Sequence, residues 1–543
     1  MQKSTLPCKA AILSGLLLLS PLPGDSPWIA KSLQAETQPP KTTDSDNDFS
    51  LERILHESEL EPGAPGQFLI PFEKLKYEQL NDLPIGVFDS GIGGLTVLET
   101  ILGLDAYHNH TARPGPDGIP DFEGEKFIYF GDQANMPYGN YASRGDVNFL
   151  RELIVRDAMF LLGTKSWQSP AAPEVVYSKP PVKAIVIACN TATAFGLSDI
   201  RAAIEGWRLT IPVIGVVEAG ANSLVQQLPS KGPAETIAVM ATLGTCSSNA
   251  YPKAISKAAG QAGKRVPLVI QQGSIGLAGA IEGNPSFVQS NASDAHTTVP
   301  YQGPSSDNPN AKIQPDLATV YAFQQSGLIT SQAPSGSAQV VRLNSVDNYV
   351  RFDVVEMVDR YSKQFAPPHS QTPPITKVIL GCTHFPFESE MILGELTRLR
   401  DLKREDGSHP YRNLLAEEIQ IIDPAELTAK ELYKTLLARR LGRIPFIPST
   451  EAGSESSTEY RAKPEVSGFY FSVANPANQT GLDADGNLTN DYKYGRKPGW
   501  ANKEDTLPVP LEIENMPDAL SKLLKEKCQH IWAELSKAQV PTN

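Results

Sequence analysis

The 543-residue sequence has little cysteine, little histidine and fewer basic than acidic side chains. Its five cysteines are too sparse for a disulfide framework, and its eight histidines show no metal-ligand spacing. Lysine and arginine number 48 against 61 aspartate and glutamate, which gives a formal net charge of −13. This deficit of positive charge argues against nucleic-acid binding and favours solubility. No lysine stands in a Schiff-base setting.

One apolar run lies near the start of the sequence and is too short for a comfortable transmembrane helix. It reads AAILSGLLLLSPL at 10–22 and follows Lys3 and Lys9, which is the pattern of a signal peptide. We therefore expect residues 1–35 to be a signal peptide or an N-terminal anchor. The protein is then expected to be exported to the periplasm or cell envelope. A misassigned start codon and a cytoplasmic location are the alternatives.

Three stretches are rich in polar and turn-forming residues. They are an acidic leader at 36–82 and two insertions at 284–345 and 444–510, of which the first is expected to be loop. DADGN at 483–487 resembles part of a calcium loop but lacks the acidic ligand that should follow, so we predict a turn. Long surface insertions are tolerated and often cover or gate a site.

Two cysteines stand at the ends of two similar apolar segments, VIACNTAT at 186–193 and VILGCTHF at 378–385. Each segment predicts a buried parallel strand, and the loops at the carboxyl ends of such strands hold ligands in open α/β sheets. Cys189 and Cys382 are therefore predicted to face a shared cleft, with one thiol on each side. A lone cysteine in such a place is more often a small buried apolar residue, and this alternative applies to each thiol.

Polar side chains follow other predicted strands too. IGVFDSGIGGLTVLETI at 85–101 predicts a strand, a glycine-rich turn and the start of a helix, with Asp89 and Ser90 at the strand tip. ETIAVMATLGTCSSNAY at 235–251 predicts another strand that ends in hydroxyl side chains. Asp89 and Thr242 can bind a ligand or simply cap the helix that follows.

Together these motifs resemble the glutamate racemases of the aspartate/glutamate racemase family. The resemblance is carried by FDSGIGGLTVL, YFGD with PYG, ACNTAT, ATLGT and LGCTHFP, in this order, over about residues 83–430, with a weaker echo in GFYFSVANP at 468–476. It implies an α/β fold of two pseudo-symmetric parallel-sheet domains with the active site in the cleft between them. It also implies a cofactor-independent isomerase that interconverts L- and D-glutamate, the latter for peptidoglycan biosynthesis.

The resemblance also assigns roles to individual residues. Cys189 and Cys382 match the two thiols that exchange the Cα proton, while Asp89, His384 and Glu282 match residues placed to assist them. The residues expected to hold the substrate are Asp89, Ser90, Tyr138, Gly139, Asn190, Thr191, Thr242, Thr383 and His384. No metal ligand is expected.

The sequence departs from the family pattern in two places. The cysteine-proline that precedes the Glu282 position in the family is absent, and QQGSIG stands in the neighbourhood instead, so a surface helix position is the alternative for Glu282. In QANMPYG, Gln133 and Asn135 stand where the family commonly has threonine and arginine. This second departure bears on substrate preference more than on reaction type.

The expected chemistry fits these residue types. Without pyridoxal phosphate there is no electron sink, so the site must stabilise a carbanion-like transition state by hydrogen bonds and local dipoles. A thiolate removes the Cα proton on one face and a neutral thiol returns one on the other. A free thiol has a pKa near ~8.5, which a helix N-terminus or a nearby cation lowers.

Chain order suggests the boundaries of the domains. We expect one lobe at 83–211, a second at 212–418, and a tail at 419–543 that returns to the first lobe. The tail is expected to carry IQIIDP as a strand and 514–538 as an amphipathic helix, with Cys528 in the core.

Three classes of function remain open to the sequence. The first is a racemase of glutamate or a similar amino acid. The second is a related enzyme, such as an aspartate racemase, a hydantoin racemase or a decarboxylase. The third is a catalytically silent protein that binds an amino acid. In each case the partner is a small-molecule amino acid and not a nucleic acid, while a homodimer and membrane anchoring through the N-terminal segment are left open.

Overall fold

The fold is taken from a computed structural model of the chain. It describes residues 48–60, 64, 66–76, 80–169, 174–229, 235–289, 300–332, 339–365, 373–443, 463–478, 480–516 and 518–538. The signal-like segment 1–35 lies outside the described residues, so its identity and the exported location stay predictions. Within these described ranges, no helix is both long enough and apolar enough to cross a membrane.

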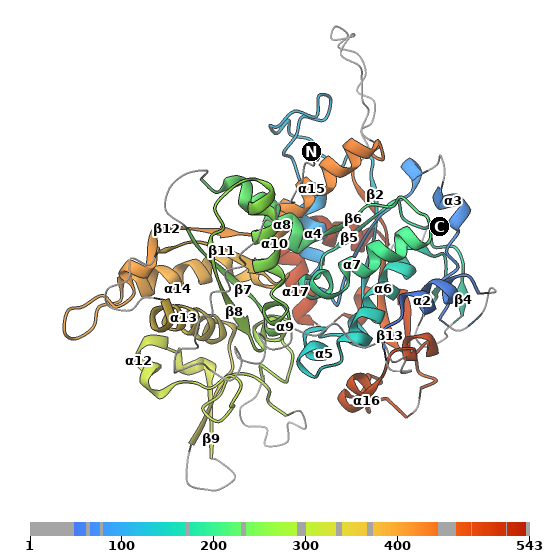
Figure 1. Cartoon of the computed structure of the whole chain (residues 1–543). Coiled ribbons are helices and arrows are strands. Elements are labelled where there is room, and N and C mark those ends of the chain that lie inside the picture. Colours follow the sequence, from blue (N-terminus) through green and yellow to red (C-terminus); the bar gives the residue numbers. More distant parts are fainter. Residues whose placement is uncertain are drawn as a thin grey trace, which may run out of the picture. The chain divides into compact units, whose positions relative to one another are not determined.

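Six strands form the first sheet, in the order β14-β13-β2-β1-β5-β6. Strands β2, β5, β6 and β13 of this sheet are labelled in Figure 1. Their bounds are β1 Ile85–Asp89, β2 Lys126–Gly131, β5 Ala184–Ile187, β6 Val213–Gly215, β13 Glu465–Ala474 and β14 Thr506–Pro510. All neighbours pair in parallel except β14, which runs antiparallel to β13. Strands β1 and β5 are buried along their whole length, as expected for parallel strands covered on both faces. We call this sheet and its helices lobe 1.

Four parallel strands form the second sheet, in the order β12-β11-β7-β8. Their bounds are β7 Thr236–Thr242, β8 Leu268–Ser274, β11 Ile375–Gly381 and β12 Leu415–Ile422. We call this sheet and its helices lobe 2.

The two sheets share one strand order. In chain order, β1, β2, β5 and β6 occupy the same relative places in lobe 1 as β7, β8, β11 and β12 occupy in lobe 2. Strand β5 therefore corresponds to β11, and Cys189 and Cys382 follow these two strands. The expected α/β fold with two related parallel sheets is confirmed.

Helices fill the connections between the strands. The long ones are α4 Leu95–Leu102, α6 Val147–Leu162, α7 Asn190–Gly206, α8 Val216–Gln227, α10 Ala250–Gln261, α13 Val346–Phe365, α14 Ser389–Asp401 and α15 Pro424–Arg439. Helix α8 contacts both α10 and α15, and α15 contacts α4. One apolar core, which includes Val87, Leu224, Val239 and Leu432, runs through these helices from the first sheet to the second. This shared core fixes the strand ends of the two lobes relative to each other.

Several shorter elements complete the described fold. They are α5 Gly139–Ser143, α9 Leu243–Ser247, α11 Leu277–Ile281 and a two-stranded ribbon of β3 Ser166–Trp167 and β4 Val175–Val176. Helices α5, α9 and α11 come after strands β2, β7 and β8 in the sequence, and β3 and β4 form a small sheet of their own.

The strand pairings shift the two expected boundaries between the lobes, near residues 212 and 419, toward the C-terminus. Residues 213–215, expected in lobe 2, form β6 and pair with β5 of lobe 1. IQIIDP, expected to return to lobe 1, begins inside β12, which pairs with β11 of lobe 2. Chain order could not place either strand, because tertiary packing decides the partner of an edge strand. The return to lobe 1 begins with β13, which pairs with β2.

The leader and the first insertion contain regular structure. The leader carries α2 Leu51–Ser58 and α3 Phe72–Lys76, and Ile54 and Leu75 are buried in a core of lobe 1. The first insertion, expected to be loop, carries α12 Ala318–Tyr321 and an antiparallel hairpin of β9 Leu328–Gln332 and β10 Gln339–Leu343. The loop prediction is wrong there because Tyr321, which stacks on Phe323 and Phe352, gives this polar segment an apolar core.

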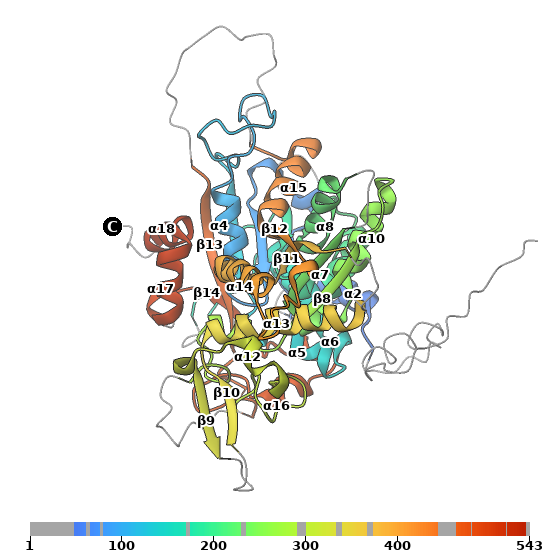
Figure 2. The same ribbon diagram turned by 90° about the vertical axis from the view of Figure 1, so that its left-hand side faces the viewer.

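The second insertion and the C-terminal region pack on lobe 1. Helix α16 Asn490–Gly495 lies between β13 and β14 in sequence. DADGN forms the predicted turn, in which the Asp483 carboxylate accepts from the backbone N–H groups of Asp485 and Asn487. The single helix expected at 514–538 is instead two, α17 Asp518–Lys527 and α18 Gln529–Ala538, and α18 contacts α4 and β13 (Figure 2). Cys528 between them is buried, as expected.

Candidate active site

Cys189 caps the helix that follows β5. Its Sγ accepts a hydrogen bond from the backbone N–H of Ala192 at 3.4 Å and donates to Ser90 Oγ, at the tip of β1, at 3.5 Å. The side chain is only 6% exposed. Burial, and then the neighbouring Asp89, raise the pKa of the Cys189 thiol, and these effects outweigh the hydrogen bond that the Ala192 N–H donates to it. Cys189 therefore rests as a neutral thiol, a proton donor.

Cys382, which follows β11, has a different environment. Its Sγ lies 3.7 Å from Nδ1 of His384, and Nε2 of His384 lies 2.7 Å from Oε1 of Glu282, just after α11. Burial alone would lower the pKa of His384, but the Glu282 carboxylate and the Cys382 thiol raise it well above its usual value. The raised pKa favours the imidazolium form of His384, and a nearby cation is the kind of neighbour that stabilises a thiolate.

The glycine-rich turn of lobe 1 packs directly on this part of lobe 2. Thr96 Oγ1 donates to the backbone oxygen of Thr383 at 3.1 Å. A Cβ atom on Gly93 would lie 2.5 Å from Cε1 and 2.8 Å from Nδ1 of His384, so only glycine fits there. Burial raises the pKa of the nearby Asp89 carboxyl, while the His384 charge opposes the rise. Asp89 therefore interacts electrostatically with both Cys189 and His384, one from each lobe.

Short polar side chains of the two lobes also meet each other. The hydroxyl oxygens of Thr191, Thr242 and Thr245 form a triangle with sides of 3.4, 3.1 and 3.1 Å. The Tyr251 hydroxyl donates to Oδ1 of Asn190 at 2.7 Å, which orients the amide so that its NH₂ group remains a donor. Thr242 also caps α9, so both roles expected for it are compatible.

The Tyr138–Gly139 turn contacts the second lobe with its main chain and not with the Tyr138 side chain. The Tyr138 hydroxyl is buried and donates within a carboxylate pair, 2.6 Å from Asp132 and 2.7 Å from Asp157, inside lobe 1. Gly139 instead reaches lobe 2, because a Cβ atom on Gly244 would lie 2.7 Å from its Cα. The backbone at 138–139 is thus the part of this turn that contacts the other lobe.

The contacts bring the candidate residues together into two linked groups. The lobe 1 group is Asp89, Ser90, Gly139, Asn190, Thr191 and Cys189, and the lobe 2 group is Thr242, Glu282, Thr383, His384 and Cys382. Thr96 and Tyr251 complete these groups without having been predicted, and Asp157, also not predicted, holds the Tyr138 hydroxyl inside lobe 1. Tyr251 closes the ATLGTCSSNAY segment, but nothing in its spacing signals a contact with a residue 61 positions away.

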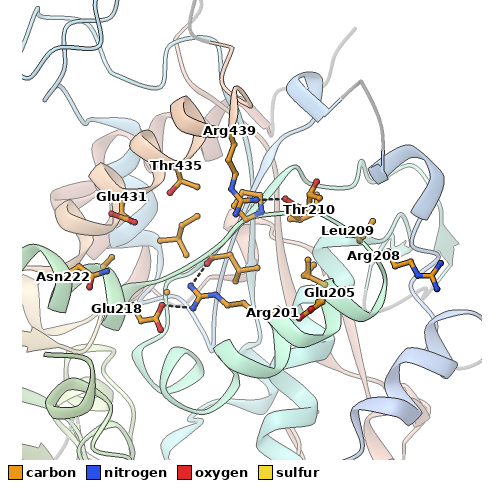
Figure 3. Close-up of a pocket in the computed structure, with 17 residues that line it drawn as sticks. Arg201, Glu205, Arg208, Leu209, Thr210, Glu218, Asn222, Glu431, Thr435 and Arg439 are labelled. Carbon is orange, nitrogen blue, oxygen red and sulfur yellow. Dashed lines mark hydrogen bonds and ion pairs between the residues drawn. The ribbon is translucent and has the colours of Figure 1, made fainter. Parts of the chain in front are cut away.

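A separate concave pocket of about 640 Å³ has none of these residues in its lining. Figure 3 shows the residues that line it. It is lined by α7, the residues around β6, α8 and α15, and contains neither Cys189 nor Cys382. Two of its arginines are engaged: Arg201 pairs with Glu218 at 2.8 Å, and Arg439 donates to the Thr210 backbone oxygen at 2.9 Å. This pocket is therefore not part of the candidate active site.

Comparison with known proteins gives one family. Residues 162–299 match the model of the Asp/Glu/hydantoin racemases. The glutamate racemase of Pediococcus pentosaceus is 37% identical over 178 residues, which are 33% of this chain and 50% of that protein. That of Limosilactobacillus fermentum is 34% identical over 209 residues, which are 37% of this chain and 61% of that protein. The chain thus spans about half to three fifths of the length of these relatives.

Among solved structures, glutamate racemase isoform RacE1 from Bacillus anthracis is 24% identical, with a TM-score of 0.37, over 66% of this chain and 84% of that one. The resemblance to glutamate racemases that the motifs indicate is confirmed by the matched sequences.

Proposed function

We propose that this chain, which resembles the glutamate racemases, is a cofactor-independent amino-acid racemase that works by a two-cysteine, two-base exchange at Cα. One observation carries the proposal. Cys189 and Cys382 follow corresponding strands, β5 and β11, of two sheets with the same strand order, and contacts across the lobes join their surroundings. Racemisation needs a base on one face of a carbon and an acid on the other, and this arrangement supplies one thiol from each lobe.

The two thiols have different surroundings. Cys382 lies beside His384, whose pKa is raised by the Glu282 carboxylate and by Cys382, so the neighbour of this thiol favours a positive charge. Cys189 is held as a neutral thiol by burial and by Asp89. In the first direction, the Cys382 thiolate takes the Cα proton and Cys189 delivers its own to the opposite face.

The opposite direction uses the same groups with their roles exchanged. Cys189 must then become the thiolate, and Cys382 the acid. The N–H of Ala192, which donates to Sγ, and the Ser90 hydroxyl, which can rotate to donate there, stabilise the negative charge on Cys189. Asp89 has a raised pKa and is therefore suited to hold a proton near Cys189.

The remaining polar groups suit an amino-acid substrate. The hydroxyls of Thr191, Thr242 and Thr245 bond to one another and can instead donate to a carboxylate. The Asn190 amide presents donors beside Cys189. Developing negative charge at the substrate carboxylate is then stabilised by fixed donors at the N-terminus of α7. Glutamate is the proposed substrate, because the matched relatives are glutamate racemases.

The proposal is tested by incubating the purified chain in deuterated water with a panel that includes L- and D-glutamate and L-aspartate. Chiral chromatography should show both enantiomers of glutamate, and mass spectrometry should show deuterium at Cα. Cys528→Ala, which alters a buried thiol in the C-terminal helices, is the matched control and should remain active. Exchange with aspartate and not glutamate would keep the reaction and change the substrate. Tight amino-acid binding with no exchange would identify a binding protein instead.

A further inference from the structure

Arg496, in the second insertion, is a buried cation next to the Tyr138–Gly139 turn. Its side chain is 1% exposed. Its Nη2 donates to Oδ1 of Asn135 and, at 3.1 Å, to the Tyr141 hydroxyl. Its Nε donates to the backbone oxygen of Lys493 at 3.2 Å. The guanidinium is thus held between the insertion and the segment that follows β2.

Asn135 links Arg496 to the Tyr138–Gly139 turn through Asp132. Its amide nitrogen donates to both carboxylate oxygens of Asp132, at 2.9 and 3.0 Å. Asp132 in turn accepts from the Tyr138 hydroxyl at 2.6 Å. Tyr138 precedes Gly139, whose main chain contacts Gly244 of lobe 2. A continuous series of hydrogen bonds therefore joins Arg496 to the Tyr138 side chain, and the chain from Tyr138 leads directly into Gly139.

Neighbouring residues of the insertion hold the same turn. Lys493 Nζ donates to the backbone oxygen of Met136 at 2.8 Å, and Asn140 donates to the Tyr494 hydroxyl at 3.1 Å. Residues 493–496 thus contact both ends of the 136–140 segment. Asn135 stands where the glutamate racemases, which the chain resembles, commonly have arginine. In this chain a guanidinium reaches the same segment from the insertion, as Arg496.

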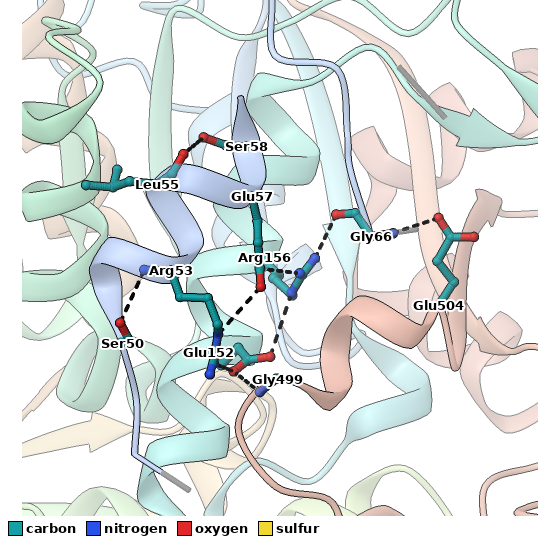
Figure 4. Close-up of polar contacts among 10 residues, drawn as sticks. All are labelled: Ser50, Arg53, Leu55, Glu57, Ser58, Gly66, Glu152, Arg156, Gly499 and Glu504. Carbon is teal, nitrogen blue, oxygen red and sulfur yellow. Dashed lines mark hydrogen bonds and ion pairs between the residues drawn. The ribbon is translucent and has the colours of Figure 1, made fainter. Parts of the chain in front are cut away.

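The insertion is itself fixed to lobe 1 by charged contacts with the leader and with α6 (Figure 4). The backbone N–H of Gly499 donates to Oε2 of Glu152 on α6 at 2.7 Å, and Arg53 of α2 binds the same oxygen at 2.6 Å. Glu504 accepts from the Gly66 backbone N–H at 3.0 Å. Glu152 is 1% exposed, so the contact between its carboxylate and the Gly499 backbone is buried and holds the insertion against α6.

We propose that Arg496 is a positioning residue for the 132–140 segment, and that the second insertion sets the geometry with which the main chain at 138–139 meets the substrate. The proposal rests on the proposed racemase function. A guanidinium with three acceptors around it fixes Asn135, and Asn135 fixes the Asp132 carboxylate that holds Tyr138. Loss of Arg496 would let the turn move, although no thiol is touched.

The experiment compares Arg496→Gln with Lys497→Gln in the full chain. Lys497 is the adjacent cation, but its ion pair with Asp146 is on the surface, with the lysine side chain 49% exposed. Steady-state rates are measured with L-glutamate, and amide hydrogen exchange is measured at 132–141 and, as an internal reference, at β7. For Arg496→Gln we expect KM to rise roughly tenfold with a smaller change in kcat, and exchange to increase at 132–141 but not at β7. Lys497→Gln should resemble the parent protein.

A double-mutant cycle tests whether Arg496 acts through Asn135. If Arg496 acts through Asn135, Asn135→Ala should reproduce the rise in KM, and the double variant should be no worse than the more severe single one. Exchange at 132–141 that is unchanged in Arg496→Gln, or that rises equally at β7, would overturn the proposal. A parent protein with no racemase activity would refute the proposed function alone, because hydrogen exchange still decides whether Arg496 positions this segment.

Discussion

Nε2 of His384 and Oε1 of Glu282 lie 2.7 Å apart, although 102 positions separate the two residues in the sequence. Both side chains are more than nine-tenths buried. The carboxylate on one side and Cys382 on the other raise the pKa of the buried His384 imidazole. In the proposed mechanism this imidazole is the neighbour that supports Cys382 as a base.

Replacing Glu282 by glutamine should weaken this base. The change removes the charge that raises the pKa of His384, so that pKa should fall and the imidazolium should be lost at a lower pH than in the parent. We expect kcat/KM to drop roughly 10²-fold and its alkaline limb to move to lower pH. Glu218→Gln, at an exposed pair with Arg201, is the control. An unchanged pH profile for Glu282→Gln would mean that Glu282 does not tune His384.

Replacing Gly93 by alanine should separate the lobes at the site. The new methyl group would collide with the His384 ring and the Thr383 hydroxyl, which follow the second thiol. We expect activity to fall roughly 10²-fold while circular dichroism and the cooperative unfolding transition persist. Gly394→Ala, in α14 with open space around the new Cβ, should leave activity unchanged and stability equal or slightly higher. Equal activity in the two variants would contradict the close packing of the lobes at Gly93.

Replacing Asp353 by asparagine should change how stability depends on pH. Burial raises the pKa of this α13 carboxyl from 3.8 to about 7, and Gln272 donates to it at 3.2 Å. Between these two values the folded state binds more protons than the unfolded state, so the free energy of unfolding falls as pH rises. The asparagine side chain does not titrate. In the variant, the decrease in the free energy of unfolding between pH 3.8 and about pH 7 should therefore be smaller by roughly 1–3 kcal/mol, as measured by urea titrations.

The control for that measurement is Asp401→Asn, whose carboxylate is 59% exposed. It should show the pH dependence of the parent protein. If Asp353→Asn does so as well, Asp353 is already ionised in the folded protein throughout the interval.

The strand tips of the site could be predicted from the sequence because their signals are local. An apolar run that stops at a cysteine or an aspartate predicts a buried strand and a polar loop, which places Asp89, Cys189 and Cys382 without any knowledge of tertiary contacts. Parallel strands of one sheet end at the same edge, so the closeness of Asp89 and Cys189 followed from the fold class. Cys382 follows a strand of the second sheet, so its place beside them depends on how the two lobes pack.

Contacts between distant segments could not be predicted in this way. The distance from Arg496 to Asn135 is 361 positions, and neither residue lies in a periodic pattern that signals the contact. The direction of the Tyr138 hydroxyl, into lobe 1 and toward Asp157, depends on packing that a motif does not encode. The pairing of β6 with β5 and of β12 with β11 likewise depends on which lobe each of these edge strands packs against.

The most direct test of the two-base account is Cα deuterium exchange by Cys189→Ser and Cys382→Ser, each measured separately with L- and D-glutamate in deuterated water. A serine hydroxyl is far too weak a base at neutral pH, so racemisation should fall by roughly 10³-fold or more in both variants. Each variant should retain exchange with only the enantiomer that faces its remaining thiol, and the two variants should retain opposite enantiomers. Near-normal racemisation in either variant, or exchange of the same enantiomer by both, would contradict the account.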